Sequence, residues 1–197
     1  MELSRTSQRR PVHRGAITLF EASVYFVVAM LVIAVAVSQG GNLFNTNDSN
    51  TEYNNASEIM AKTKATMKTG GIYNFTSAAV MTGAFIQFGG APTNMQVVGT
   101  KSSGSATLQN TWGGAVTLTP VATAGGQKSA FSLTYASVPQ EACVTLALKM
   151  SVSPGVATTM VNSTSTNGAV AASAVGTQCT ADKGSAGQNT LTWTSNT

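Results

Sequence analysis

The chain has 197 residues, and only 9% of them are charged, whereas about a quarter is usual in a soluble protein. All four arginines stand before residue 15, so the remaining chain carries seven lysines against six acidic residues and is nearly neutral. Nucleic-acid phosphates bind clusters of Lys and Arg, so we expect no nucleic-acid partner. The single histidine, His13, lies in the same basic segment. The sequence therefore predicts neither catalytic residues nor a metal or cofactor site.

The first forty residues combine a basic leader with an apolar segment. Residues 1–16 are basic and polar, and residues 22–37 form a run of sixteen without a charge. Extended back to residue 17, the run reaches about 21 residues, which is long enough to cross the hydrocarbon core of a bilayer as a helix. The cations before it predict a cytoplasmic N-terminus. The following SQGG is a poor signal-peptidase site, so we expect segment 17–41 to be retained in the membrane.

The apolar segment is followed by the pattern of an amphipathic helix. Apolar and small side chains recur at spacings of three and four residues, namely Tyr53, Ala56, Ile59, Met60, Thr63 and Met67. Glu58 and Lys62 are spaced for an ion pair along the helix, and Gly70-Gly71 is a stop signal. We expect one long helix from about residue 17 to residue 69. The glycines and the Asn, Asp and Ser residues near Gly40–Asn50 should soften its middle.

The rest of the chain is typical of a β-sheet. Short β-branched or aromatic runs, in part separated by Gly-Gly pairs, predict the strands QVVG, ATLQN, AVTLTP, FSLTYA and TLTWT. One helix from about Pro139 to Lys149 interrupts them, with an apolar face that includes Cys143. Residues 153–178 are interpreted either as a display surface or as a solvated loop with one edge strand. The predicted fold class is α+β, with the long N-terminal helix packed on an antiparallel sheet in a head that spans residues 42–197.

The two cysteines, Cys143 and Cys179, match no zinc-binding spacing and no CxxC motif. We expect them to form one structural disulfide, which implies an oxidising compartment; the alternative is two reduced, buried thiols. Trp112 and Trp193 are interpreted as core or turn-packing residues, although either could instead face a glycan receptor.

The stretch GAITLFEAS, residues 15–23, resembles the processing site of type IV prepilins. A carboxylate such as Glu21 in an apolar segment is costly unless a partner offsets its charge. The resemblance implies such a partner: Glu21 would pair with the methylated N-terminal amine of a neighbouring subunit and set the filament register. In the family a Gly precedes the cleaved bond and the glutamate is fifth in the mature chain. Cleavage after Gly15 makes Glu21 the sixth residue, whereas cleavage between Ala16 and Ile17 makes it the fifth, and the position of the glutamate favours Ile17.

The C-terminal half indicates which class of type IV pilin the chain resembles. VPQEACVTLAL, a second cysteine about 36 residues later and the strand LTWT resemble the disulfide-bounded region of type IVb major pilins, and NTWGGAVTLTP resembles bundle-forming-type pilins. The pattern is most similar to the PilS pilins of enteric type IVb systems. It implies the fold described above and a structural subunit without enzymatic activity.

The resemblance also implies partners and a location. The chain would begin as an inner-membrane prepilin, be cleaved by a prepilin peptidase, and be assembled by dedicated machinery into a homopolymer. The resulting extracellular pilus would contact host or bacterial surfaces for adhesion, self-aggregation or mating. Two alternatives remain: a pseudopilin of a type II-like secretion system, and a periplasmic binding domain with a single membrane anchor.

Overall fold

The computed structural model describes residues 47–184 and 186–197. These residues belong to Leu43–Thr197, one of the two units into which the chain divides, and we call this unit the head. The predicted leader and the apolar segment 17–41 lie outside the described residues. Within the two described ranges, no helix is long and apolar enough to cross a membrane.

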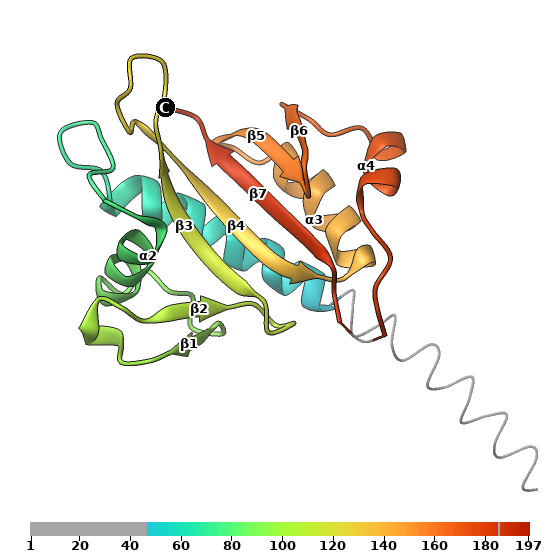
Figure 1. The fold of residues 1–197 in the computed structure, drawn as a ribbon, viewed down its shortest axis with the longest axis horizontal. Coiled ribbons are helices and arrows are strands. Elements are labelled where there is room, and N and C mark those ends of the chain that lie inside the picture. Colours follow the sequence, from blue (N-terminus) through green and yellow to red (C-terminus); the bar gives the residue numbers. More distant parts are fainter. Residues whose placement is uncertain (1–46, 185) are drawn as a thin grey trace, which may run out of the picture. The chain divides into compact units, whose positions relative to one another are not determined.

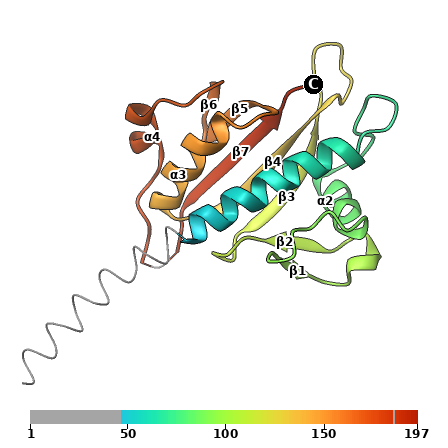
Figure 2. The same cartoon turned by 180° about the vertical axis from the view of Figure 1, so that it is seen from behind.

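The head is built from one antiparallel sheet with helices packed against one of its faces (Figures 1 and 2). The first described residues form a helix over residues 47–66. The elements that follow are α2 (Ala78–Gln87), β1 (Gln96–Val98), the short 3-10 helix η1 (Lys101–Ser103), β2 (Thr107–Gln109), β3 (Ala115–Val121), β4 (Ala130–Val138), α3 (Gln140–Ser151), β5 (Val156–Val161), β6 (Thr164–Asn167), α4 (Ala172–Gln178) and β7 (Asn189–Ser195). The predicted α+β head with an antiparallel sheet is confirmed.

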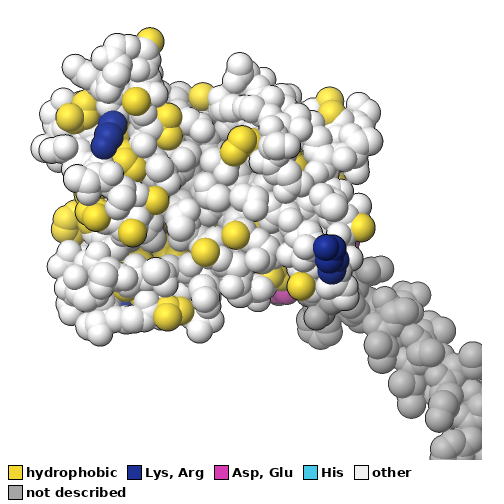
Figure 3. All heavy atoms as spheres, viewed as in Figure 1, with side chains coloured by type: hydrophobic (Ala, Val, Ile, Leu, Met, Phe, Trp, Pro, Cys, Tyr) yellow, Lys and Arg dark blue, Asp and Glu magenta, His cyan; other side chains and the backbone are white. Residues whose placement is uncertain are grey.

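The strands lie in the order β1-β2-β3-β4-β7-β5-β6, and each neighbouring pair is antiparallel. The C-terminal strand β7 is therefore central, between β4 and β5. Its alternating sequence buries Leu191 and Trp193 beneath the helices and turns the intervening threonines to the opposite face. On that outer face Thr134 and Thr192 are cross-strand neighbours with hydroxyls 2.9 Å apart. Figure 3 shows that this face carries few charged side chains.

Helix 47–66 crosses the middle of the sheet and covers the core (Figure 2). Ala56, Ile59 and Thr63 on its predicted apolar face have no exposed surface, which confirms the three- and four-residue pattern. On its solvent side, Glu58 and Lys62 form the expected ion pair at 2.6 Å.

The helix ends at residue 66, slightly earlier than predicted. Thr69 and Ile72 exchange backbone hydrogen bonds of 2.9 and 3.2 Å across Gly70-Gly71. Both glycines have positive φ angles, which a residue with a side chain rarely adopts. The helix therefore ends four residues before Gly70, and the glycine pair forms the tight turn that follows it.

Two regions differ from the sequence-based expectation. The first is α2, for which no helix was predicted. It packs on β2 and β3, and its Thr82 hydroxyl accepts a hydrogen bond from the Leu118 N–H at 2.9 Å. The second is the stretch 153–178, which forms β5, β6 and α4 instead of a loop with one edge strand.

Gly83 provides a test of how closely α2 approaches the η1 turn. A Cβ atom at Gly83 would lie 1.8 Å from the backbone oxygen of Gly104, so one element must move. We expect Gly83→Ala to lower the free energy of unfolding by about 1–3 kcal/mol. A Cβ atom at Gly176, also inside a helix, would have no neighbouring atom within 4 Å, so Gly176→Ala should be neutral or stabilising. Urea denaturation of both variants checks the difference, and equal losses would contradict the close approach.

Candidate functional site

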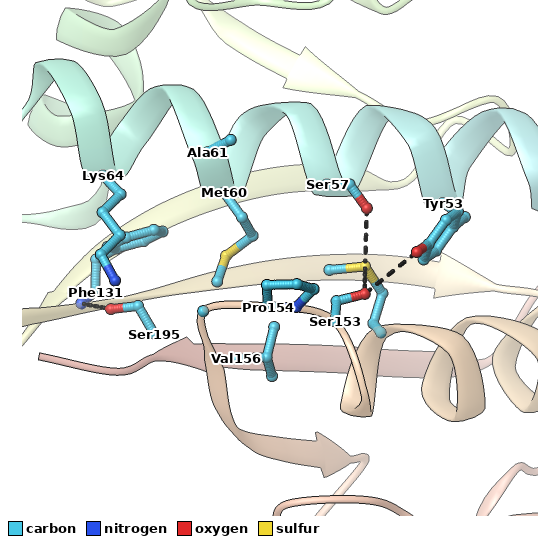
Figure 4. A pocket seen from close by; sticks show the side chains of 12 residues that line it. Tyr53, Ser57, Met60, Ala61, Lys64, Phe131, Ser153, Pro154, Val156 and Ser195 are labelled. Atoms are coloured by element: carbon cyan, nitrogen blue, oxygen red, sulfur yellow. Dashed lines mark hydrogen bonds between the residues drawn. The ribbon is translucent and has the colours of Figure 1, made fainter.

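A groove runs between helix 47–66 and the turn that joins α3 to β5 (Figure 4). Its volume is about 240 Å³. We call it the helix groove, and it is lined by Tyr53, Ser57, Met60, Ala61, Lys64, Phe131, Met150, Ser153, Pro154, Gly155, Val156 and Ser195. The segments on its two sides are about a hundred residues apart in the chain, as the Tyr53–Ser153 contact shows.

Hydrogen bonds fix the walls of the helix groove. The hydroxyls of Tyr53 and Ser153 are 3.4 Å apart across it. The Ser57 hydroxyl donates to the thioether sulfur of Met150 at 3.6 Å. At the other end, Lys64 Nζ donates to Asn196 Oδ1 at 2.6 Å. These contacts join the helix to α3, to the α3–β5 turn and to the residue that follows β7.

The chemistry of the helix groove is that of a binding surface. Lys64 is the only charged side chain in its lining, and the lining includes no carboxylate, histidine or cysteine. Its serine hydroxyls belong to Ser57, Ser153 and Ser195, and the amine of Lys64 donates to Asn196 Oδ1 rather than to one of them. The thioethers of Met60 and Met150, together with Pro154, provide soft apolar contacts instead.

A buried carboxylate joins the same helix to the turn between β2 and β3. Glu52 is fully buried, and its Oε1 accepts the Thr111 N–H at 2.8 Å while its Oε2 accepts the Asn55 amide at 3.3 Å. Burial raises the pKa of Glu52 despite these hydrogen bonds. Tyr135 is buried beside it, and burial together with the nearby carboxylate raises the pKa of the phenol well above its ordinary range.

The turn held by Glu52 is built by Asn110. Its side-chain oxygen accepts the backbone N–H groups of Trp112 and Gly114 at 3.1 and 2.8 Å, and its amide donates to the Ala136 oxygen at 2.8 Å. A Cβ atom at Gly114 would lie 1.8 Å from that same oxygen. The sequence NTWGG thus encodes a tight turn packed on β4, and Glu52 fastens it to helix 47–66.

Glu52 was not predicted as a site residue, although the sequence contains a signal for it. It precedes Ala56 by four residues and Ile59 by seven, so the helical period places it on the apolar face. A charged residue at such a position is rarely buried without partners. The helix groove left no comparable signal, because its two sides come from distant parts of the chain.

Replacing Glu52 with glutamine should change how stability depends on pH. The folded-state pKa of Glu52 is raised above its ordinary value of 4.5, so its stabilising effect is complete below that pH and is lost as the pH rises through the folded-state pKa. Glutamine stays neutral and still accepts from Thr111. We expect the variant to gain stability relative to the wild type as the pH rises from 4 to 8, measured by urea denaturation. Glu58→Gln on the exposed side controls for net charge, and a difference between Glu52→Gln and the wild type that does not vary with pH would contradict the interpretation.

The structure places some of the sequence-predicted site residues and leaves others outside the described ranges. Cys143 on α3 and Cys179 at the end of α4 are joined in a disulfide, as expected. Trp193 is fully buried in the core, and Trp112 is partly buried and packs against the core. Both agree with their interpretation as packing residues. Gly15, Ala16, Ile17 and Glu21 lie outside the described residues.

The family model described as PilS N terminal matches residues 46–196. The chain belongs to the PilS family. No curated protein matches the chain significantly. Among solved structures, the crystal structure of a type IVb pilin from Salmonella typhi is 38% identical with a TM-score of 0.66, and the match covers 75% of this chain and 99% of that one. An NMR structure of the type IVb pilin PilS from the same organism is 40% identical with a TM-score of 0.52, covering 76% of this chain and 97% of that one.

These similarities confirm the resemblance to type IVb pilins that the sequence indicates. The matched region coincides with the described head of this PilS-family chain, including its sheet and its disulfide. A pilin family is a family of structural proteins and not of enzymes.

Proposed function

We propose that this PilS-family chain is the major structural subunit of a type IVb pilus and polymerises through its N-terminal helix. The family match over residues 46–196 carries the proposal, because it covers nearly the whole head. The basic leader and the apolar segment 17–41 supply the parts that a prepilin needs. In the filament, apolar helices pack against one another instead of against lipid, so the transfer changes little apolar exposure and packing decides the arrangement.

Processing would create the partner that Glu21 lacks in the prepilin. A prepilin peptidase cleaves between Ala16 and Ile17, with cleavage after Gly15 as the alternative, and the new amine is methylated. An N-terminal amine has an ordinary pKa near 8 and is mostly charged at neutral pH. Glu21 of one subunit then pairs with this amine of a neighbour. A buried pair of this kind serves to fix the register between subunits.

The remaining steps need other proteins and surfaces. The processed subunit leaves the inner membrane through an assembly machine that this chain does not encode. The heads form the outside of the extracellular pilus and make the contacts with host or bacterial cells that serve adhesion, self-aggregation or mating. A pseudopilin would share the processing but would be scarce in material sheared from cells.

The test is the intact mass and the N-terminal sequence of the chain in filaments sheared from cells. We expect an abundant chain that begins at Ile17, carries one added methyl group and lacks two hydrogens because of the Cys143–Cys179 disulfide. A start at Ala16 would move Glu21 to the sixth position and revise the register. A chain that begins at Met1, or that is absent from the sheared fraction, would refute the pilin proposal in favour of an anchored domain.

A further inference from the structure

Phe88 is displayed on a fixed corner of the head. It is 66% exposed, and no other aromatic side chain in residues 47–184 and 186–197 falls in the exposed class. Its backbone N–H closes the end of α2 by donating to the Ala84 oxygen at 2.9 Å. The chain then turns at Gly89, which has a φ of +75°, and Gly90 has no room for a side chain because its Cβ would lie 2.3 Å from the Phe85 ring. The ring of Phe88 therefore lies outside the core, next to a turn that glycines form.

The sequence around Phe88 is uncharged, and its side chain shares a hollow with Met67 and Phe75, beside which Lys128 donates to the Phe75 oxygen at 2.6 Å. Residues 69–100 contain no Lys, Arg, Asp or Glu. Val80, Ala84 and Phe88 are four residues apart and form one apolar stripe on α2, with Val80 and Phe88 exposed and Ala84 half-buried. We call this stripe the Phe88 corner. Exposed apolar side chains grouped in this way are typical of a site that another protein surface covers.

The helix groove has the chemistry that an aromatic ring requires. Its volume of about 240 Å³ exceeds the roughly 150 Å³ of an apolar cavity that accepts benzene. The sulfur atoms of Met60 and Met150 lie in its lining, and thioethers pack favourably on aromatic rings. Lys64 also lines the groove, and its ammonium group could make a cation–π contact with the face of such a ring (Figure 4).

α2, which carries the Phe88 corner, and α3, which leads into the helix groove, lie on opposite sides of helix 47–66 (Figure 2). α2 packs on β2 and β3, whereas α3, which leads into the groove, packs on β5 and β7 at the other half of the sheet. Phe88 therefore cannot reach the groove of its own chain. Two different surfaces that fit each other on opposite sides of one molecule make a head-to-tail contact, which repeats from subunit to subunit and produces an open filament when it does not close into a ring.

We infer that Phe88 of one subunit inserts its ring into the helix groove of the next subunit. The inference rests on the proposed function and names the contact between heads that accompanies the packing of the N-terminal helices. The occupant is a second copy of this chain, since a filament of such subunits presents the exposed Phe88 ring once in every subunit.

Alanine substitution in the full-length chain gives the first test. Phe88→Ala removes the ring, and we expect the amount of sheared filament to fall about tenfold or more at equal pilin level, the scale expected for an aromatic anchor. Because the ring is exposed in the single subunit, the melting temperature of the purified protein should not fall. Val98→Ala removes another exposed apolar side chain, on β1, and should leave the filament yield unchanged.

A cysteine pair locates the contact. Ala61 is exposed in the lining of the helix groove, so Phe88→Cys combined with Ala61→Cys should link neighbouring subunits in a ladder of multimers on non-reducing electrophoresis of sheared filaments. Peptide mapping should find residue 88 linked to residue 61. The pair Val98→Cys with Ala61→Cys should give no ladder.

The outcomes separate the contact from the proposed function. Normal filament yield from Phe88→Ala, or intact filaments of the cysteine variant without a ladder, would overturn the contact while the pilin assignment stands. If the cysteine variant does not assemble, the comparison of Phe88→Ala with Val98→Ala decides. If the wild-type chain itself yields no filament, the proposed function fails, and the contact fails with it.

Discussion

Replacing both Cys143 and Cys179 with alanine should lower the free energy of unfolding by about 3–4 kcal/mol. The two residues are 36 apart in sequence, so the disulfide closes a long loop in the unfolded chain and reduces its conformational entropy. A domain is typically stable by only about 5–15 kcal/mol, so the loss would remove a large share of the total. Alanine is preferable to serine here, because both positions are buried and a serine hydroxyl would need a partner.

The effect should be largest around α4 and the segment that follows it. There the chain is also held by Asn189, whose oxygen accepts the Thr180 N–H at 2.6 Å and whose amide donates to the Val138 oxygen at 3.1 Å. Urea denaturation measures the global loss, and amide exchange over residues 172–184 measures the local one. Wild-type protein treated with a reductant is the matched control and should behave like the double variant. A loss below about 1 kcal/mol, within the range of a single net hydrogen bond, would mean that the Asn189 hydrogen bonds hold this segment without the disulfide.

Periodic features of the sequence predicted much of the head. The spacing of Ala56, Ile59 and Thr63 located the buried face of helix 47–66, and the alternation around Leu191 and Trp193 located β7. Both patterns arise because one face of each element is buried and the other is in water, so the sequence records the burial directly.

The features that the sequence did not predict have no periodic pattern of buried and exposed residues. α2 shows no clear helical period, because apolar residues occur both on its buried side and at the exposed Val80. The central position of β7 and the two sides of the helix groove depend on contacts between distant segments, which local patterns do not contain. Glu52 is an intermediate case: its position on the helix was visible, but its N–H partner at Thr111 is 59 residues away.

Glu21→Ala should abolish the filaments, and we expect at least a hundredfold less chain in the sheared fraction. Assembly of this variant would bury the N-terminal amine of the neighbouring subunit without a counter-charge. Removing one partner of a buried ion pair costs about 3–5 kcal/mol at each interface. Because one such interface recurs for every subunit added, the loss should prevent growth of the filament. Mass spectrometry of the inner-membrane fraction should still find a chain that begins at Ile17, since the cleaved bond lies outside the substitution.

Glu21→Gln distinguishes charge from shape, because glutamine has nearly the same size and still accepts a hydrogen bond from the amine. If charge sets the register, Glu21→Gln should lose most of the filament as well, whereas Glu58→Gln, on the exposed side of helix 47–66, should retain it. Normal filaments from Glu21→Gln would mean that packing of the apolar segment sets the register. The carboxylate would then act before assembly, while the subunit is still in the membrane and has no neighbour whose amine it could meet.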